Sequence, residues 1–555
     1  ADTTAEEPAE TTAEEPADDA TTEESATSTD ELIVLGYSDE QVPVWVRNFN
    51  PFAPDPLNTA ANMLFEPMTI FNIAQNGEPT PWLATGYEYG DDLQSITFTL
   101  RDGVKWSDGE AFNADDVLFT FNMLQEYPAL DKSAVWEILS GVEKGDDHTI
   151  TFNLNTVYTL AHERIGALNI VPEHIWAEVE DPVTFTNENP VGTGPFTEIR
   201  EFQDQVYLQC KNPHYWQEGK PKFDCLRLPA NPGNEQAIAG MIAGDIQWAG
   251  HFVPDIEETY IAANPEHNHY YFAPNDTISL YMNTTKPPFD DLAFRRALSM
   301  APDRDEIVAI ASYGYATVND NPGGLTAIYR DWYNNEAIEE HAPLGTFAPD
   351  EATAILDEAG YVDQDGDGWR DMPDGSPIAF KIQVVNGWTD WVTAVQMTAE
   401  YFQDIGLNAE VDTPDFGAWF SNLQAGTYDV SIGWGSVNPT PWNYYHDALH
   451  SAMIIEDAAQ GISWSRWNSP ETDQLIDDFV ATTDVEEQQE IINQLQVAVM
   501  ENVPFIPLFA NPGWYEYNTT EFTGFPSEEN NFARGMPFEG VAERLIVVTS
   551  IEPAK

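Results

Sequence analysis

Apolar positions follow two different periods along this chain, and each period predicts one type of element. Apolar residues recur at every second position over 96–100, 150–154 and 378–384, which is the period of half-buried β-strands. Over 117–124, 307–311 and 487–503 the apolar spacing is helical instead. Strands and helices therefore alternate from Leu32 onward, which predicts a multidomain protein of the α/β or α+β class.

Two of the predicted helices begin with a capping pattern. Asn113 is followed three residues later by Asp116, and Asp303 is followed by Glu306. A short polar side chain that binds the first free backbone N–H groups, with an acid three residues on, favours helix initiation. These positions predict the starts of the helices over 117–124 and 307–311.

Residues 1–31 differ from the rest of the chain. They contain twelve acids, no Lys or Arg and no aromatic residue. A segment with low hydrophobicity and one sign of charge cannot bury enough apolar surface to fold, so we expect a disordered acidic tether. The sequence has no run of 18 apolar residues and no hydrophobic signal region at Ala1, so we expect an already processed chain without a membrane span.

Length and charge narrow the function classes. With 555 residues the chain is long enough for two or three folded units. Its 94 acidic residues outnumber 22 Lys and Arg, which gives a net charge of −72. Such a field repels phosphate backbones and anionic lipids, so we expect neither nucleic-acid binding nor electrostatic membrane docking.

The sequence contains two cysteines, Cys210 and Cys225, each within a strand-like run. A disulfide between them would close a loop of about 15 residues and stabilise the fold by about 3 kcal/mol in an oxidising compartment. The alternative is two buried free thiols that act as small core residues. No His or third Cys stands near either one, so a metal site there is not expected.

Two aromatic-rich stretches carry the main functional signal. Residues 386–391 read Asn-Gly-Trp-Thr-Asp-Trp, and residues 433–445 contain two Trp and two Tyr among Gly, Asn, Thr and Pro. Indole rings beside neutral amides offer a stacking surface and uncharged hydrogen-bonding groups, which suits a sugar ring. The alternative is that each Trp fills core, because burial is the commoner fate of a large aromatic side chain.

Several motifs in order resemble the family 5 extracellular solute-binding proteins, the dipeptide, oligopeptide, nickel and oligosaccharide receptors of ABC importers. The motifs are DDLQSITFTLRDGVKWSDG over 91–109, PVGTGPF over 190–196, NPHYW over 212–216, GDI over 244–246 and NTTKPPF over 283–289 leading into RRAL over 295–298. The resemblance covers Leu32 to Ile551.

This resemblance implies an α/β, two-lobed fold of the periplasmic-binding-protein type II kind, with an extra subdomain in lobe I. By similarity lobe I comprises 32–57, 191–275 and 504–555, its subdomain 58–190, and lobe II 276–503. It implies a monomeric receptor that closes on a solute and delivers it to a membrane permease. It also implies a periplasmic protein, or one lipid-anchored at the extracellular face through a cysteine upstream of the tether.

Within the family, the phrases at 48–52, 387–391 and 438–442 are similar to the oligosaccharide-binding branch, with β-linked glucan fragments such as cello-oligosaccharides as the nearest comparison. Affinity is expected from the closed cleft as a whole, since each polar contact displaces water. The expected ligand contacts are Asn48, Trp248, Asn386, Trp388, Trp391, Trp434, Asn438, Trp442, Tyr445 and Trp514. An oligopeptide receptor of the same fold is the alternative, and it would place charged groups in the cleft.

One loop matches the spacing of a calcium site. Its expected ligands are Asp363, Asp365, Asp367, Trp369 through its carbonyl, Asp371 and Asp374. Position 12 is Asp where Glu usually binds in bidentate fashion, and the flanks read as helix and then strand, so the loop is not a true EF-hand. The alternative is a metal-free Asp/Gly turn. No other cofactor is expected.

An enzyme is the rival from a different class. The sequence has no His-Glu-x-x-His pair, no Gly-x-Ser-x-Gly turn and no Walker-type phosphate loop. With 94 acids, a carboxylate pair at glycosidase spacing would arise without meaning. We therefore expect a non-catalytic protein, with a secreted polysaccharide-degrading enzyme as the alternative.

Overall fold

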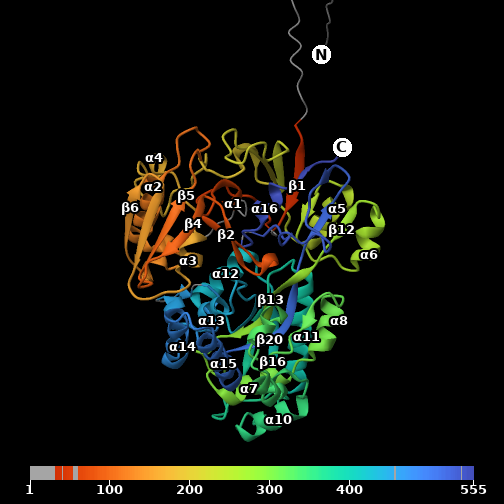
Figure 1. The fold of residues 1–555 in the computed structure, drawn as a ribbon. Helices are drawn as coiled ribbons and strands as arrows, with labels where there is room; N and C mark the ends of the chain where they lie inside the picture. The colour runs from red at the N-terminus through yellow and green to blue at the C-terminus, as the bar shows by residue number, and fades with distance from the viewer. Residues whose placement is uncertain (1–31, 40–41, 54–60, 456–457, 460, 539) are drawn as a thin grey trace, which may run out of the picture. The chain divides into compact units, whose positions relative to one another are not determined.

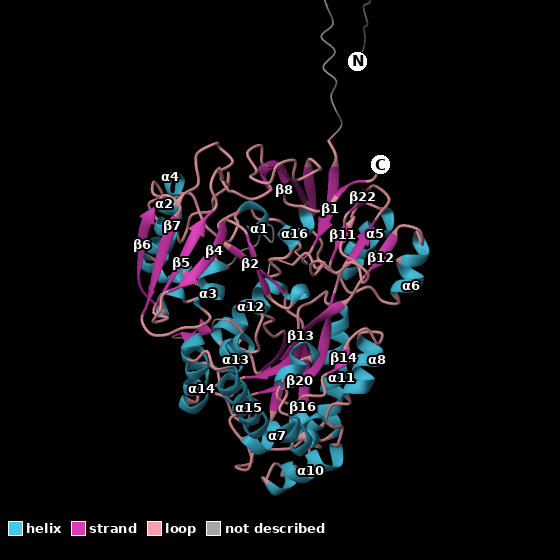
Figure 2. Ribbon diagram, viewed as in Figure 1, coloured by secondary structure: helices cyan, strands magenta, loops and turns pink. Residues whose placement is uncertain are grey.

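The computed structural model describes residues 32–39, 42–53, 61–455, 458–459, 461–538 and 540–555 (Figures 1 and 2). Contacts divide the chain into Ala1–Leu32 and Ile33–Lys555. The predicted tether, 1–31, lies outside the described residues, and the fold below is that of the second unit.

A seven-stranded sheet is built around the first strand. Its order is β12-β21-β11-β1-β10-β9-β8, and β1 runs parallel to both β10 and β11. The bounds are β1 Val34–Ser38, β8 Phe196–Gln203, β9 Val206–Lys211, β10 Cys225–Pro229, β11 Trp248–Ala249, β12 Asn268–Tyr270 and β21 Glu516–Asn518. Strands from both ends of the chain therefore share one sheet.

A four-stranded antiparallel sheet contains two of the predicted strands. Its order is β4 (Ala84–Tyr89), β5 (Ser95–Leu100), β7 (Thr149–Leu154) and β6 (Leu139–Asp146). The alternate residues of β5 and β7, such as Phe98 and Phe152, are buried, as the period-two pattern predicted. Helix α2 (Ala114–Glu126) begins at the predicted capping box, in which the Asn113 side chain accepts from Asp115 N and Asp116 accepts from Asn113 N.

A six-stranded sheet has the order β14-β20-β13-β17-β15-β16. The bounds are β13 Ala273–Met282, β14 Thr317–Val318, β15 Ala379–Gln383, β16 Asn408–Asp412, β17 Val430–Gly433 and β20 Phe505–Gly513. Strands β15 and β17 are parallel, and β13 is antiparallel to both β17 and β20. The predicted helices appear here as α8 (Arg304–Ala311), capped by Asp303, and α15 (Val485–Asn502).

The remaining elements connect and cover the sheets. They are α1 Ala61–Leu64, β2 Thr69–Asn72, β3 Glu78–Pro81, α3 Ala161–Gly166, α4 Glu173–Trp176, α5 Asn234–Ala243, α6 Ile256–Thr259, α7 Leu292–Met300, α9 Asn335–Glu340, α10 Pro349–Glu358, α11 Thr389–Asp404, α12 Phe416–Ala425, α13 Trp442–Leu449, β18 Ile454–Ile455, β19 Ala458–Ala459, α14 Pro470–Ala481, β22 Phe522–Thr523, α16 Arg544–Val548 and β23 Glu552–Pro553. Short 3₁₀ turns include η1 Ile73–Gln75 and η8 Ser463–Ser465.

The position of strand β20 can be compared with the predicted lobe boundaries. The boundary at 504 assigns β20 to lobe I, whereas β20 pairs with β13 and β14 inside the six-stranded sheet. The polypeptide then enters the seven-stranded sheet at β21. The boundaries themselves stay a prediction.

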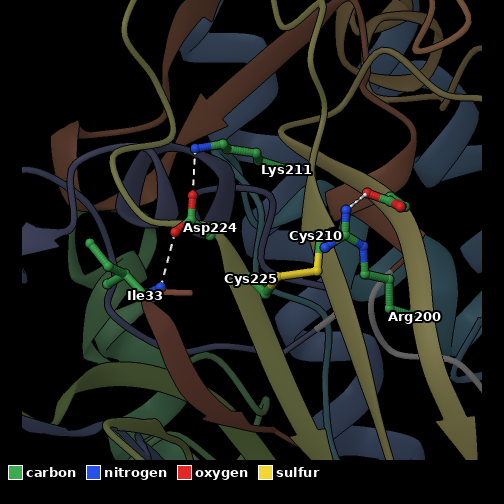
Figure 3. The surroundings of a disulfide bond; sticks show 7 residues. Ile33, Arg200, Cys210, Lys211, Asp224 and Cys225 are labelled. Atoms are coloured by element: carbon green, nitrogen blue, oxygen red, sulfur yellow. Dashed lines mark hydrogen bonds and ion pairs between the residues drawn. A yellow bond between two sulfur atoms is a disulfide. The ribbon is translucent and has the colours of Figure 1, made fainter. Parts of the chain in front are cut away.

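The predicted disulfide joins two neighbouring strands of the seven-stranded sheet (Figure 3). Cys210 of β9 and Cys225 of β10 lie directly opposite each other in the ladder, with a Cα–Cα distance of 4.0 Å. Beside the bridge, Lys211 Nζ lies 2.5 Å from Asp224 Oδ1, and Ile33 N donates to Asp224 Oδ2 at 2.9 Å. The bridge and this ion pair fasten β9 and β10 next to the chain entry into β1.

Among the described residues, the helices are all too short or too polar to cross a bilayer.

Candidate functional site

Five tryptophans and two phenylalanines form an aromatic cluster beside the six-stranded sheet. The members are Trp388, Trp391, Phe416, Trp419, Phe420, Trp434 and Trp464. We call this set the indole cluster. Trp419 and Trp464 are fully buried, whereas Trp388 and Trp434 are half-buried and lie 6.1 Å apart between ring centroids. The cluster thus has a buried base and a partly exposed edge.

The local fold places the half-buried rings of Trp388 and Trp434 at the same edge of the sheet. Trp388 follows β15 and precedes the first turn of α11, and Trp434 follows β17 directly. Because β15 and β17 are parallel, their carboxyl ends lie side by side, where ligand sites of open α/β sheets commonly form. Tyr281 OH fixes the loop after β17 by donating to the Trp434 carbonyl at 2.8 Å.

Packing against Trp464 explains why a glycine precedes Trp434. A Cβ added at Gly433 would lie 2.4 Å from the Trp464 ring, closer than real Cβ contacts. The ring of Trp464 in turn stands edge-on to Trp434, with centroids 5.1 Å apart and an interplanar angle of 87°. The glycine therefore allows a buried indole to support the exposed one.

The chain that leaves the indole cluster contains no charged residue between positions 434 and 445. Most side chains from Trp434 to Thr440 are half-buried. Tyr329 OH anchors the middle of this segment, since it accepts from Asn438 N at 2.9 Å and donates to Asn438 O at 2.8 Å. We refer to 434–445 as the neutral segment.

The neutral segment and the start of α11 lie where elements next to the three largest sheets meet. From the side of the seven-stranded sheet, Asn234 Nδ2 donates to Thr389 Oγ1 at 3.0 Å. In the connection between β2 and β3, which form a two-stranded sheet, Gly77 lies so close to Pro439 that an added Cβ would be 2.5 Å from Pro439 Cβ. Tyr158 packs edge-on against Trp442 at 5.8 Å between centroids. This junction is the candidate site.

Half of the predicted ligand contacts lie at this junction. Each is at least partly exposed or packs against a partly exposed ring. Trp388 and Trp434 form the exposed edge, Asn386 is exposed, and Trp391 packs under Trp388 with centroids 4.9 Å apart. Asn438 is half-buried in the neutral segment.

Trp442 and Tyr445 belong to the neutral segment, but their side chains are buried against neighbouring elements. Trp442 is 3% exposed, its Nε1 donates to Ile476 O at 2.8 Å, and its ring stacks on His446. Tyr445 is fully buried, and its hydroxyl donates to Gly323 O at 3.0 Å. These side chains hold α13 in place and offer no surface to a ligand in this structure.

Asn48, Trp248 and Trp514 are not brought to the indole cluster. Trp248 is fully buried in the seven-stranded sheet, where its Nε1 donates to Gly535 O at 2.7 Å. Trp514 is 7% exposed and packs against Phe252. Asn48 lies in a loop and accepts from Asn50 N. Each of the three has a packing or turn role here.

Sequence reasoning missed several members of the site. Trp419 and Trp464 stand outside the two stretches singled out above, although Phe420 with Asn422 and Trp467 with Asn468 give their surroundings the same mixture of aromatic and amide residues. The fold shows that both rings support Trp434. Asp390 lies between the predicted contacts Trp388 and Trp391 in the sequence and is buried. Burial raises the pKa of Asp390 to about 7, against the lowering effect of the backbone N–H groups of Trp391 and Asp390.

The calcium-like loop lies apart from these aromatic residues in sequence and has its own geometry. Ligand oxygens of Asp363, Asp365 and Asp371 all lie within 4.8 Å of one another. Asp363 also accepts from Gly366 N and Gly368 N, at 2.6 and 3.0 Å. Asp374 accepts instead from the backbone and hydroxyl of Ser376. Calcium binding by the loop stays a prediction.

Comparison with known proteins gives the family. Residues 78–454 match the family described as bacterial extracellular solute-binding proteins, family 5. The chain belongs to this family. Its members are binding proteins, not enzymes, and the chain is a solute-binding receptor of an ABC importer.

Curated family 5 relatives are distant and varied. The chain is 26% identical over 476 residues to di/tripeptide-binding protein 1 of Pseudomonas aeruginosa, which covers 81% of this chain and 84% of the relative. It is 27% identical over 462 residues to heme-binding protein A of Haemophilus influenzae, with 78% and 79% covered. The named solutes of these relatives therefore differ in chemistry.

Solved family 5 structures share the two-lobed fold. The mannohexaose-bound periplasmic oligopeptide-binding protein of an oligopeptide ABC transporter from Thermotoga maritima has a TM-score of 0.86 and 26% identity, and the match covers 94% of this chain and 98% of that one. The oligopeptide-binding protein AppA of Bacillus subtilis, in complex with a nonapeptide, has a TM-score of 0.78 and 22% identity, with 94% and 99% covered.

Proposed function

We propose that this receptor captures an oligosaccharide, such as a β-linked glucan fragment, at the junction of its lobes and delivers it to the permease. The observation that carries the proposal is the exposed edge of the indole cluster, which continues directly into the neutral segment. A flat apolar face followed by amide and hydroxyl groups matches a chain of sugar rings with hydroxyl rims.

Aromatic support gives the exposed rings a defined orientation. Trp434 is held by Trp464 and Trp419 at 5.1 and 5.2 Å between centroids, and its backbone is fixed by Tyr281. A preoriented ring loses little conformational entropy when a ligand stacks on it, so more of the stacking energy appears as affinity.

Charge at the site argues against a zwitterionic peptide as the main ligand. A peptide brings an ammonium and a carboxylate, which are held best by opposite charges when they leave water. The neutral segment contains no charged side chain, and burial raises the pKa to about 7 for two nearby carboxyls, Asp390 and Asp276. Asp447, which accepts from Ser436 Oγ, is the acid in contact with the segment. Several relatives are nevertheless named for peptides, so an oligopeptide receptor is the second candidate.

Calorimetry with a panel of ligands tests the proposal. Cello-oligosaccharides and manno-oligosaccharides should give saturable heat with the wild-type protein, whereas di-, tri- and longer peptides should give none at the same concentrations. Saturable binding of peptides alone would overturn the saccharide assignment and leave the receptor assignment intact.

We further infer that binding shifts an equilibrium between open and closed lobes, and that the protein is a monomer, either periplasmic or lipid-anchored at the extracellular face of the membrane. A ligand that contacts both sides of the junction favours the closed state. X-ray scattering should then show a smaller radius of gyration at saturating glycan, and an unchanged radius would contradict closure.

A further inference from the structure

A segment between β22 and α16, residues 531–538, bridges the seven-stranded sheet and the β2–β3 hairpin, and we call it the strap. On one side, Trp248 Nε1 of β11 donates to Gly535 O at 2.7 Å. On the other side, Asn72 Nδ2 at the end of β2 donates to Phe532 O at 2.8 Å. The middle of the strap is buried between these contacts.

A buried ion pair fastens the strap to the start of α16. Arg534 Nε and Nη2 donate to the two carboxylate oxygens of Glu543, at 2.8 and 3.0 Å, and the side chains are only 6% and 1% exposed. A buried pair contributes little net stability, because the desolvation of both charges offsets their attraction, and apolar side chains often serve as well. Two parallel hydrogen bonds do define a geometry, however. The pair therefore points to a role in positioning.

The ion pair holds a residue on each side. Glu543 Oε1 also accepts from Ile73 N at 2.9 Å, and Ile73 is the first residue of η1 in the turn between β2 and β3. Arg534 Nη1 donates to Asn275 Oδ1 at 3.5 Å. Asn275 belongs to β13, the strand by which the chain enters the six-stranded sheet after β12. The pair thus connects the β2–β3 turn with β13.

Backbone hydrogen bonds carry the position of Ile73 to the tip of the turn. Gly77 N donates to Asn72 O at 2.8 Å, and Asn76 N donates to Ile73 O at 3.2 Å. Asn76 and Gly77 both adopt left-handed backbone conformations, with φ of 59° and 73°. The turn is therefore closed on itself, and an anchor at Ile73 also anchors Gly77.

The tip of the turn lies against the neutral segment. A Cβ added at Gly77 would be 2.5 Å from Pro439 Cβ, so the two backbones are in close contact. Tyr329 holds the neighbouring Asn438 from the opposite direction. By the predicted boundaries the turn belongs to lobe I and Pro439 to lobe II, so the two meet only when the lobes are together.

We propose that Arg534 and Glu543 are positioning residues for the solute, which hold the β2–β3 turn as the surface against which the neutral segment closes. Both are buried, so they act on the solute through the turn. A turn held in advance loses less entropy on closure, so more of the interaction energy appears as affinity. This inference rests on the proposed function, because it takes the neutral segment as part of the solute site.

Calorimetry with cellohexaose tests this role in two double variants. Arg534→Met/Glu543→Met replaces the ion pair by an apolar pair, which a buried position tolerates better than the loss of one charge. It removes the acceptor of Ile73 N, so we expect an affinity about tenfold weaker than that of wild type. Arg534→Met/Glu543→Gln removes the same charges but keeps an acceptor, so its affinity should lie between the two.

A further variant avoids the buried charges. Asn72→Ala/Gln75→Ala removes side-chain hydrogen bonds from the turn to the carbonyls of Phe532 and Asn531, so it should fold. Cellohexaose affinity should fall by about threefold or more. The double Cys→Ser variant, in which β9 and β10 lose their disulfide, is the control for lowered stability, and its affinity should be unchanged. Thermal melting of every variant measures stability separately from binding.

Hydrogen exchange without ligand examines the turn directly. In R534M/E543M the Ile73 amide loses its acceptor, so the amides of residues 73–77 should exchange faster than in wild type. The same amides should exchange more slowly in R534M/E543Q than in R534M/E543M. This measurement does not depend on which solute the protein binds.

The outcomes are distinguishable. Wild-type affinity in both R534M/E543M and N72A/Q75A would overturn the positioning role and leave the saccharide function intact. An equal loss of affinity in the Cys→Ser variant would overturn it as well, because lowered stability alone would then explain the effect. A wild-type protein that binds no glycan would overturn the proposed function. Equal exchange rates at 73–77 in wild type and R534M/E543M would overturn the anchoring of the turn whatever the solute.

Discussion

At the residue scale, Trp434 is the side chain on which the ligand assignment depends most. Its ring is half-buried and supported from below by Trp464. We expect Trp434→Ala to weaken glycan binding by about 2 kcal/mol, roughly thirtyfold, because a stacked aromatic anchor is lost. Calorimetry would measure the change.

The control for this variant is Trp369→Ala, which removes a half-buried indole from the calcium-like loop. Glycan affinity should be unaffected there. Trp434→Phe should fall between wild type and Trp434→Ala, since a smaller ring keeps part of the stacking area. Unchanged binding by Trp434→Ala would contradict the stacking surface.

Exposure of individual tryptophans could not be predicted from the sequence. Trp434 and Trp442 belong to the same aromatic stretch, yet one lies at a strand end and the other faces α14 through Ile476. Which side of a ring meets solvent depends on elements that are remote in sequence. The composition of the stretch therefore predicts an aromatic site, but it does not distinguish a partly exposed ring such as Trp434 from a buried ring such as Trp442.

At the element scale, the disulfide between β9 and β10 should stabilise the seven-stranded sheet. Replacing both Cys210 and Cys225 by Ser removes a bridge with a sequence separation of 15. We expect a loss of about 3 kcal/mol of unfolding free energy, measured by denaturant unfolding. Glycan affinity should be unchanged, and equal stability of the variant and the wild type would contradict the expectation.

The calcium-like loop gives a second prediction at this scale. Three carboxylates whose oxygens lie within 4.8 Å repel one another, and a bound cation removes that repulsion. Millimolar Ca²⁺ should therefore raise the melting temperature, and chelator should reverse the shift. Asp365→Asn should abolish the response, whereas Asp102→Asn, at an exposed acid outside the loop, should retain it.

Elements with local signals were predicted well. The start of α2 is set by Asn113 and Asp116, which are neighbours along the chain, and β5 and β7 follow from alternation within six residues. The position of β20 between β13 and β14 has no local signal. It depends on pairs that are far apart in the chain, such as Thr317↔Ala510 and Ala273↔Gly513, which a single sequence does not reveal.

At the scale of the whole molecule, buried carboxyls should make stability depend on pH. Burial raises the pKa to about 7 for Glu66, Asp276 and Asp390 and to about 8 for Glu163. A carboxyl that keeps its proton only in the folded state stabilises less as pH rises through its folded pKa. Each group contributes up to about 1.4 kcal/mol per pH unit.

Two buried histidines act in the opposite direction but at lower pH. Burial lowers the pKa of His162 and His251 to about 4. Below about pH 6.5 these histidines bind protons more readily in the unfolded chain, so they lower the stability of the fold as the pH falls. Between pH 6.5 and 8 the carboxyls dominate, and the melting temperature should fall. Glu163→Gln should reduce this slope, and a melting temperature that rises across the window would contradict the expected sign.

The pairing of β13 with β20 decides how the protein could be divided. A separate fragment of residues 276–503 would lack β20, an interior strand of the six-stranded sheet. Strands β13 and β14 would then have unpaired edges, which favours aggregation. A fragment from Ala273 to Gly513 would keep the ladder from Ala273↔Gly513 to Tyr281↔Phe505. Dissection for spectroscopy or for hybrid receptors should therefore cut outside this strand pair.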